Sequence, residues 1–307
     1  MKPQLTIIIP FKNEGIEVYN TVESLLKTSE LKNNLILIND ASSDDFDYRA
    51  TAEHFDAKYV EHKSSLGVAE SREHGISLCE TEFFIFFDAH MRAYTQGWDT
   101  ILLNHLKKEE RTIFCCATIA IERNSANIIS DIKGYGVTID LSTLLYTWNN
   151  SDTESENATT KIPCIMGASY ASNVAYWNKL KGLKGLCCYG YDEQFISIKV
   201  ALEGGCCRII KDIVFGHMFR VLKEVPYIIN VVDVIYNQLF IAELLYPNRL
   251  KGLIFRHIRC FSEVDSFDKA IKKLESNRTS ITDSKEYYKK IFSRDFTYVE
   301  DLNTNKL

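Results

Sequence analysis

Short apolar runs alternate with segments of helical spacing along the first part of the chain. The apolar runs, each predicted to be a strand, cover 5–9, 35–40, 57–62 and 83–87. Helical spacing fills the gaps between them, at 16–28, 46–55 and 68–79. Strands that alternate with helices indicate a parallel sheet covered by helices on both faces. The pattern therefore predicts an α/β fold whose polar strand ends gather where such sheets bind ligands.

The rest of the chain is less regular. We predict strands over 112–121, 163–173 and 206–220 and a helix over 191–205. The polar stretch 151–160 lacks periodicity, which indicates an exposed loop. From residue 221 the spacing is helical, and the charged, Lys-rich end predicts a helical C-terminal extension. We therefore divide the chain into one domain with two halves, 1–110 and 111–255, and a helical tail, 256–307.

Composition narrows the class of protein without identifying it. The 307 residues are 46% hydrophobic and 25% charged, which is ordinary for a globular protein. The net charge of -5 gives no basic field directed at nucleic acid. No segment approaches the roughly 20 apolar residues of a membrane-spanning helix. The nine cysteines fit no zinc-binding spacing, so we expect reduced, mostly buried thiols and a cytoplasmic protein.

The fourth predicted strand ends in a chemically distinctive way. The stretch FFIFFDAHMRAY passes from a buried run directly into Asp88-Ala89-His90. Residues two apart on a strand point the same way, so Asp88 and His90 are expected side by side. A carboxylate beside an imidazole suits a divalent cation. An ion pair at the start of a loop is the alternative that this motif alone leaves open.

Further motifs follow one another in a recognisable order. They are IIIPFKNE, INDASSDD, GVAESREHGI, FFDAHM, IMGASYAS, YGYDEQFISIKVALEGGCCRII and GHMFR. Over residues 4–255 this series resembles nucleotide-sugar glycosyltransferases of family 2 type. More narrowly, it resembles the catalytic domain of polypeptide N-acetylgalactosaminyltransferases. The resemblance implies a GT-A fold, a Rossmann-like, mostly parallel sheet that binds a nucleotide diphosphate sugar.

The resemblance also implies a metal site. The family's Asp-x-His motif is matched by Asp88 and His90, and the histidine of GHMFR, His217, completes the ligand set. Mn²⁺ suits a shell of carboxylate and imidazole better than Mg²⁺, although Mg²⁺ stays open. A cation held there would neutralise the charge that develops on a departing diphosphate.

Most of the expected donor-binding residues follow predicted strands or begin helices. The set comprises Pro10, Phe11, Asn13, Glu14, Asn39, Asp40, Arg72, Asp88, Ala89, Gly167, Ala168 and Arg220. Within it, Phe11, Asn13 and Glu14 are expected to line the base pocket. Gly167 and Ala168 are small enough for the backbone to approach the sugar closely. Arg220 is expected at a phosphate or at a loop that closes over the donor.

Two members of this set have specific alternatives. Asp40 is expected to accept a hydrogen bond from the uracil or to bind the ribose, but an Asx turn would need the same residue. Arg72 matches an arginine that the family places near the nucleotide, where its fork suits a phosphate or a base carbonyl. A solvated helix arginine is the plain alternative for Arg72. Glu14 has the similar alternative of an exposed loop acid.

Asp192 and Glu193 are the candidate catalytic acids. They begin a predicted helix, where acids are stabilised without any catalytic role. The family's Trp-Gly-Gly-Glu-Asn segment is Tyr-Gly-Tyr-Asp-Glu here, at 189–193. An inverting enzyme needs a base for the acceptor hydroxyl, and we choose Asp192 because it aligns with the family's glutamate. In a retaining enzyme Asp192 would instead position the sugar or the acceptor.

The predicted function is metal-dependent transfer of a sugar from a UDP-sugar to a hydroxyl acceptor. A protein, a glycan, a lipid-linked sugar and, less favoured, a modified nucleobase all qualify as acceptors. A nucleotidyltransferase is one alternative, but PFKNEGIE lacks the glycine-rich basic loop that binds a triphosphate. A non-catalytic sugar-nucleotide-binding protein is another, but it would have no use for three metal ligands. Trp148 and Trp177 are expected to pack in the core rather than stack on sugar.

Overall fold

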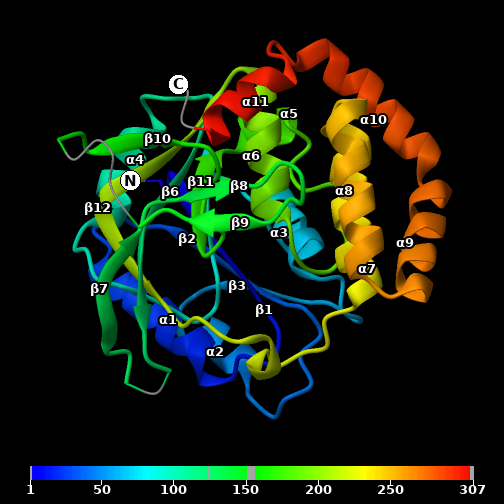
Figure 1. Ribbon diagram of the computed structural model, residues 1–307. Helices are drawn as coiled ribbons and strands as arrows, with labels where there is room; N and C mark the ends of the chain where they lie inside the picture. Colours follow the sequence, from blue (N-terminus) through cyan, green and yellow to red (C-terminus); the bar gives the residue numbers. More distant parts are fainter. Residues whose placement is uncertain (1, 124, 151–155, 305–307) are drawn as a thin grey trace.

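A ten-stranded mixed sheet forms the centre of the protein in this computed structural model, which describes residues 2–123, 125–150 and 156–304. The strand order is β10-β12-β6-β11-β4-β1-β2-β3, with β5 added to β12 and β7 to β6 (Figure 1). The strands of this sheet are β1 (Leu5–Phe11), β2 (Asn34–Asn39), β3 (Lys58–Glu61), β4 (Phe83–Phe87), β5 (Met91–Ala93), β6 (Thr112–Ile121), β7 (Ile128–Gly134), β10 (Thr159–Ile162), β11 (Ser169–Asn173) and β12 (Cys206–His217). A small separate sheet pairs β8 (Val137–Ile139) with β9 (Tyr146–Trp148).

Helices cover both faces of the large sheet (Figure 1). They are α1 (Ile16–Thr28), α2 (Tyr48–His54), α3 (Val68–Ser77), α4 (Trp98–Leu106), α5 (Val174–Lys179), α6 (Asp192–Glu203), α7 (Val231–Leu245), α8 (Asn248–Phe261), α9 (Val264–Ser276), α10 (Arg278–Ile291) and α11 (Phe296–Asn303), with a 3₁₀ turn η1 (Leu222–Glu224). Strand β1 shows how the two faces arise. Ile7 and Ile9 pack in the core that contains α1, α2 and α4, whereas Ile8 points into the opposite core with α3 and α6.

The two halves of the sheet are built differently. Strands β1 to β4 pair only in parallel among themselves, as βαβ units require. Beyond β4 the sheet is mixed, because β11 runs antiparallel to both β4 and β6, while β6 and β12 are parallel. The predicted α/β class, with a central sheet between helices and a helical C-terminal part, is confirmed.

The predicted element boundaries hold best for the strongly periodic segments. The helix at 16–28 is confirmed at both ends. The strand predicted over 163–173 begins only at Ser169, and the strand predicted over 206–220 ends at His217. Residues 151–155 of the predicted loop 151–160 lie outside the described residues. Its last two residues, 159 and 160, begin β10, so the loop prediction is wrong there. Short strands such as β5 and β8 were missed because three residues carry too little periodic signal.

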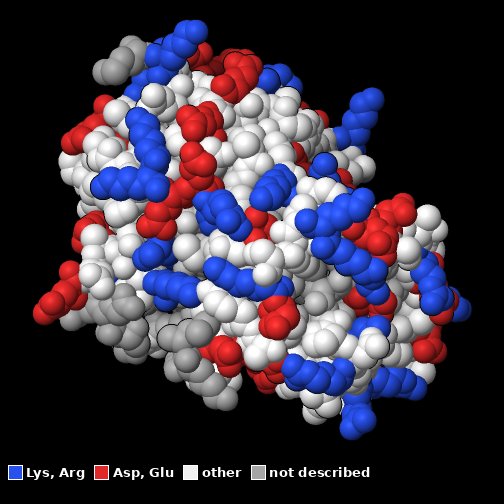
Figure 2. Space-filling view, turned by 90° about the horizontal axis from the view of Figure 1, so that it is seen from above, with Lys and Arg blue, Asp and Glu red and all other residues white. Residues whose placement is uncertain are grey.

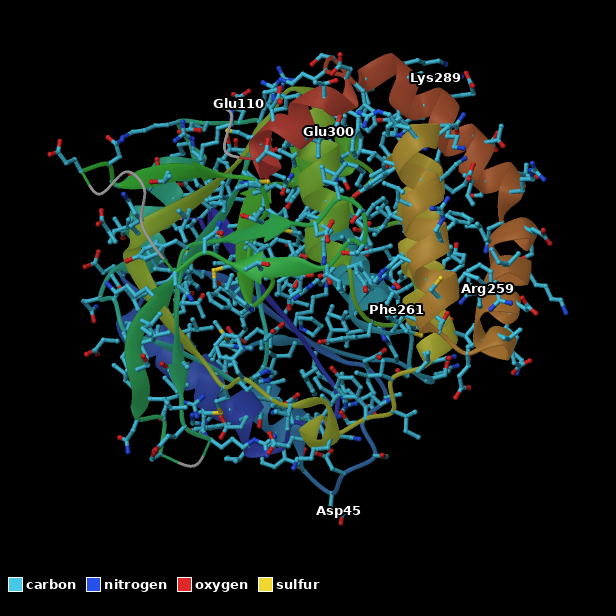
Figure 3. The ribbon with its side chains drawn as sticks, viewed as in Figure 1. Asp45, Glu110, Arg259, Phe261, Lys289 and Glu300 are labelled. Atoms are coloured by element: carbon cyan, nitrogen blue, oxygen red, sulfur yellow. The ribbon has the colours of Figure 1, made fainter. Side chains whose placement is uncertain are left out.

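The C-terminal helices are part of the core rather than an appendage to it. The predicted division at 255/256 falls inside α8, so the chain has no break there. Helices α9 to α11 bury Ala270, Leu274, Ile281, Tyr288, Phe296 and Val299. Phe261 at the end of α8 and Lys289 on α10, both marked in Figure 3, are exposed. Among the described residues, no helix has both the length and the apolar character needed to cross a bilayer.

Candidate active site

Strand pairing brings the two predicted histidine ligands together. The chain bends at 88–90 after β4 and continues as β5, which runs antiparallel to β12 with Met91 opposite His217. The backbone N–H of Met218 donates to the carbonyl of His90 at 3.2 Å. Asp88 and His90 therefore lie in a bend, and not on a continued strand as the alternation argument assumed. The pairing of β5 with β12, not strand alternation, sets His90 beside His217.

In the described part of the chain, Asp88, His90 and His217 form the one group of three potential metal ligands, which we call the metal-ligand group. One ligand atom from each lies within 4.8 Å of the others. His217 Nε2 is 3.1 Å from His90 Nε2 and 3.4 Å from Asp88 Oδ2. Ligands that share one cation at about 2.1 Å lie about 3 Å apart when they subtend a right angle. These separations fit a divalent cation bound by all three residues.

The protonation states of the group also suit a cation. Burial lowers the pKa of His217, so its imidazole is neutral at pH 7 and offers a lone pair. Burial opposes ionisation of Asp88, but the hydrogen bond from His217 and the charge of Arg72 outweigh it and lower the pKa of this carboxyl. The Asp88 side chain keeps 29% of its surface exposed, whereas those of His90 and His217 keep 14% and 12%. The group is thus shielded, with its carboxylate as the most accessible member.

Glu14 supports the group from behind. Its carboxylate forms a bidentate ion pair with Arg220, and Oε2 lies 3.3 Å from His90 Nδ1. Burial raises the pKa of Glu14, but hydrogen bonds from His90 and Arg220 outweigh this effect and bring it to about 2. A carboxylate behind a ligating imidazole fixes the orientation and tautomer of the ring. Glu14 is therefore not an exposed loop acid, and Arg220 is held by Glu14.

Arg72 links the metal-ligand group to the acidic pair. Its guanidinium donates to the Asp192 carboxylate, and Nη2 donates to Asp88 Oδ1 and to the Gly167 carbonyl, each at 3.1 Å. Only 3% of the residue is exposed, so the alternative of a solvated helix arginine is wrong. The side chain lies over the Tyr170 ring, 5.0 Å from its centroid. Among the described residues, the polar contacts of Arg72 are made to Asp88, Gly167 and Asp192. None is made to the loops after β1 and β2.

Glycines allow the elements around Arg72 to meet. Gly67 precedes α3 with a φ of 89°, and a side chain there would collide with the backbone of Cys188. The N–H of Val68 donates to the Cys188 carbonyl at 2.9 Å, so the start of α3 is tied to the loop before α6. This contact aligns Arg72 on α3 with Asp192 on α6.

Glu193 lies beside Asp192 in the first turn of α6. A Cβ added at Gly167 would collide with the Glu193 carboxyl, so this close approach of the two residues requires glycine at position 167. Burial, reinforced by the negative Asp192, raises the pKa of Glu193 well above its usual value. The neighbouring Ala168 carbonyl accepts from the Asp88 N–H at 3.0 Å, which ties β11 to the bend that contains Ala89.

Asp40 is saturated by the protein's own groups. Oδ1 accepts from His62 Nδ1 at 2.8 Å and from the Leu66 N–H at 2.7 Å. Oδ2 accepts from the Ser65 hydroxyl at 2.6 Å and from the Gly67 N–H at 2.9 Å. Burial raises its pKa, but these hydrogen bonds outweigh the effect and lower it. The observed contacts make Asp40 the residue that holds loop 62–67 in place.

The remaining predicted residues after β1 and β2 also have defined partners. Asn13 Oδ1 accepts from the Ser43 N–H at 2.7 Å, and its Nδ2 donates to the Pro226 carbonyl at 3.0 Å. Asn39 caps its own turn and donates to Tyr59 Oη at 2.9 Å. Pro10 and Phe11 are buried, and the Phe11 ring packs 4.5 Å from that of Tyr48. Phe11, the last residue of β1, thus packs in the core on the α1 and α2 side of the sheet.

Comparison with known proteins assigns the family. The glycosyl transferase family 2 model matches residues 6–173, more than half of the chain. The chain belongs to glycosyl transferase family 2. It is therefore a glycosyltransferase, and the predicted GT-A fold is confirmed by solved structures. GalNAc-T7, crystallised with UDP, GalNAc and Mn²⁺, matches 98% of this chain and 58% of its own at a TM-score of 0.81 and 16% identity. Residues 1–349 of S. aureus TarS, crystallised with UDP-GlcNAc, match 99% of this chain and 91% of theirs at a TM-score of 0.58 and 10% identity.

Sequence relatives of this glycosyltransferase point the same way as the motifs. Polypeptide N-acetylgalactosaminyltransferase 5 of Caenorhabditis elegans is 25% identical over 246 residues, and human polypeptide N-acetylgalactosaminyltransferase 10 is 27% identical over 245. Each alignment covers 73% of this chain but only 38% or 39% of the relative. The chain thus spans about two fifths of the length of these curated relatives.

A row of aromatic rings leads away from the metal-ligand group of the glycosyltransferase. The Phe219 ring is 4.4 Å from that of His217, Trp148 is 5.5 Å from Phe219, and Tyr146 is 5.9 Å from Trp148. Phe219 is 46% exposed, and Tyr146 is exposed as well. Trp148 is half-buried and packs against the edge of the core, whereas Trp177 is fully buried, as predicted, and donates to Glu73. Sequence spacing gave no signal for the row, because its members lie on β9 and after β12.

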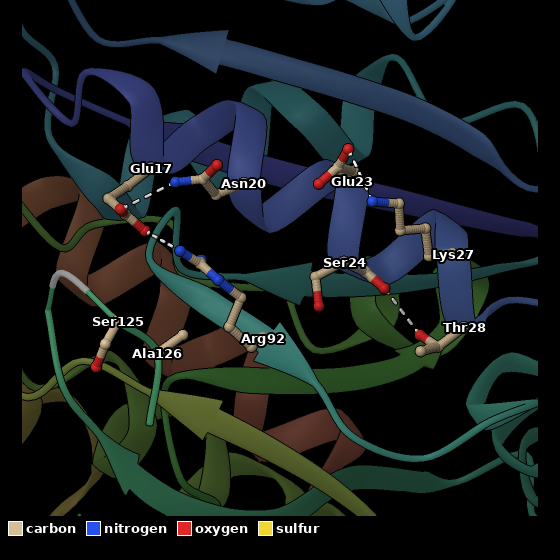
Figure 4. Close-up of a pocket in the computed structure, with 9 residues that line it drawn as sticks. All are labelled: Glu17, Asn20, Glu23, Ser24, Lys27, Thr28, Arg92, Ser125 and Ala126. Atoms are coloured by element: carbon tan, nitrogen blue, oxygen red, sulfur yellow. Dashed lines mark hydrogen bonds and ion pairs between the residues drawn. The ribbon is translucent and has the colours of Figure 1, made fainter. Parts of the chain in front are cut away.

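The hollow drawn in Figure 4 is a different feature. It lies between α1, β5 and the turn at 125–126, and its charged side chains are already paired. Arg92 donates to Glu17 at 2.6 Å, and Lys27 pairs with Glu23 at 2.9 Å. No residue of the metal-ligand group lines it. We therefore take the Asp88 group, not this hollow, as the candidate active site.

Proposed function

We propose that this glycosyltransferase moves a sugar from a UDP-sugar to a hydroxyl acceptor and that it requires a divalent cation, Mn²⁺ in preference to Mg²⁺. The observation that carries the proposal is the convergence of Asp88 and His90, in the bend between β4 and β5, with His217 at the end of β12, next to Arg72 and Asp192. Membership of family 2 argues against the nucleotidyltransferase alternative. The UDP-sugar complexes of the structural neighbours support this class of donor.

Each residue has a separate task in this proposal. A cation bound by Asp88, His90 and His217 would offset the negative charge on the departing diphosphate. Glu14 keeps the His90 ring in its ligating orientation. Arg72 balances the charges of Asp88 and of the buried Asp192, because an unpaired buried carboxylate would be costly.

We assign the sugar to the space beside Gly167, Asp192 and Glu193, and the acceptor to the aromatic row. Asp192 is fixed by Arg72, so we give it the task of orienting the sugar. Aromatic faces such as Phe219 and Trp148 bind the apolar faces of sugars and other acceptors by stacking. The acceptor hydroxyl would then approach the donor from the side of His217.

A UDP-release assay across a panel of UDP-sugars tests the proposal. We expect release with at least one donor in Mn²⁺, loss of release in EDTA, and recovery when excess Mn²⁺ is restored. Full turnover in EDTA would rule out the metal requirement. Pyrophosphate release from a nucleoside triphosphate, without UDP release from any sugar nucleotide, would instead favour a nucleotidyltransferase.

A further inference from the structure

A single side chain of α7 holds the loop that precedes α6, residues 187–191. Asn237 is completely buried, and its side-chain amide bonds to the backbone of this loop at both of its ends. Its Nδ2 donates to the carbonyls of Cys187, Tyr189 and Gly190, at 2.8, 3.2 and 3.0 Å. Its Oδ1 accepts from the Cys187 N–H at 2.8 Å. One buried amide thus satisfies four backbone groups within four residues, and it fixes the path of the chain there.

The loop needs such support because its backbone is unusual. Cys188, Gly190 and Tyr191 have φ angles of 47°, 95° and 70°, all in the left-handed region. Two of these three residues carry side chains, for which this conformation costs free energy. Helix α7 holds the loop a second time, because the Cys188 thiol donates to Asp233 Oδ2 at 3.0 Å. We therefore expect the loop to relax toward commoner backbone angles when the Asn237 amide is removed.

The same loop touches both helices that carry the central ion pair of the site. The Cys188 carbonyl accepts from the Val68 N–H at 2.9 Å, at the start of α3, the helix that carries Arg72. Tyr191, at the other end of the loop, is the N-cap of α6, whose first residue is Asp192. The amide on α7 therefore sets how the start of α3 and the start of α6 lie relative to one another.

We propose that Asn237 is a positioning residue of this glycosyltransferase, which keeps Arg72 where one guanidinium reaches both Asp88 and Asp192. The fork of Arg72 donates to both carboxylates, which come from different elements, so a small shift of α3 against α6 breaks one of the two contacts. A misplacement of about 1 Å caused by a mutation far from the chemistry can lower a rate about 100-fold. The inference rests on the proposed function, because it concerns the turnover of a UDP-sugar.

Two variants and one matched control test the inference. Asn237→Ala removes the amide, and Asn237→Asp keeps its shape but turns the donating group toward the three carbonyls into an acceptor. The control is Gln238→Ala, which removes a neighbouring buried amide of α7 that donates to the Thr143 carbonyl instead, at 3.3 Å. Each protein is measured for thermal unfolding, for UDP affinity in Mn²⁺, for kcat and KM of UDP release, and for hydrogen–deuterium exchange.

We expect kcat to fall about tenfold or more in Asn237→Ala at a temperature where the protein is folded, while UDP affinity stays within about threefold. Asn237→Asp should lose more, because a carboxylate then faces three carbonyl oxygens. In both variants, exchange should rise over 187–191 and at the start of α3. Gln238→Ala should lower the melting temperature but keep the kcat and the exchange protection of these two segments, as a purely structural amide would.

Three results would overturn the inference and leave the proposed function intact. They are a wild-type kcat in folded Asn237→Ala, an equal fall of kcat in Gln238→Ala, and unchanged exchange at the start of α3. Failure of both Asn237 variants to fold would give the amide a structural role only, and would also overturn it. A wild type that releases UDP from no UDP-sugar would instead overturn the proposed function and, with it, this inference.

Discussion

At the scale of single residues, the site depends on where each polar atom finds its partner. His217 has its Nε2 directed at Asp88 and His90, which is the arrangement that the proposed metal site requires. Glu14 and Arg72, which we expect at the donor, also contact His90 and Asp88, respectively. The sequence identified both residues but not their partners. Glu14 pairs with Arg220, 206 residues away, and Arg72 pairs with Asp192, 120 residues away.

Replacement of His217 by alanine tests the residue scale. We expect UDP release to fall at least about 100-fold at limiting Mn²⁺, because one of three ligands is lost, while the melting temperature changes by only a few degrees. Activity is measured over a Mn²⁺ titration alongside thermal unfolding. The matched control is His257→Ala on α8, which should retain activity. Loss of folding with unchanged Mn²⁺ dependence would mean that His217 is structural.

At the scale of elements, loop 62–67 connects the sheet to the helix that carries Arg72. Asp40, directly after β2, accepts hydrogen bonds from residues of this loop. The Nε2 atom of His62 in turn lies 2.9 Å from the Nδ1 atom of His74 on α3. The two rings are nearly parallel, with an interplanar angle of 5°. A hydrogen bond between these two nitrogens needs one N–H donor and one acceptor. When both rings are protonated, both nitrogens carry an N–H, so the hydrogen bond is lost and the two rings repel each other. The sequence gives no sign of the His62–His74 contact, because two histidines twelve residues apart produce no periodic signal.

The pH dependence of stability tests this contact. Burial, with the charges of His62 and Lys58, lowers the pKa of His74 below 6.5. The unfolded chain therefore takes up the proton first, so this stabilisation is present above pH 6.5 and is lost as the pH falls through the folded pKa. We expect the melting temperature to fall between pH 7 and pH 5, and this fall to be smaller by a few degrees in His74→Gln. Identical pH profiles of the two proteins would contradict the prediction.

At the scale of the whole molecule, the C-terminal helices complete the core on the α6 face. Lys199 on α6 is fully buried and donates to the Leu180 carbonyl at 3.1 Å, and Tyr288 on α10 donates to the same carbonyl at 2.9 Å. Arg294 reaches the Gly205 carbonyl at the end of α6. Lys, Arg, Asp and Glu are interspersed over the surface seen in Figure 2, which fits the modest net charge. The helical layer is therefore packed against α6 as part of the core, and we expect folding to require it.

Truncation tests this last point. A chain that ends at Phe255 would cut α8 and remove the buried side chains of α9 to α11, so we expect it to lack a cooperative unfolding transition. Tyr288→Phe in the full chain keeps the ring and removes only its hydroxyl. It should fold and lose about 1 kcal/mol of stability. A truncated chain that unfolds cooperatively near the wild-type melting temperature would show that residues 256–307 are a separable tail.

The sequence by itself determined the alternation of strands and helices, the polar ends of the parallel strands, and the candidate ligands Asp88, His90 and His217. These follow from local periodicity and from motifs a few residues long, whose signals depend only on near neighbours in the chain. Tertiary structure alone decided that β5 pairs with β12, that Arg72 bridges Asp88 and Asp192, and that Asp40 faces inward to His62. Such contacts form when distant segments bury their polar groups together, because each group needs a partner once water is excluded, and that partner is set by packing across the sheet.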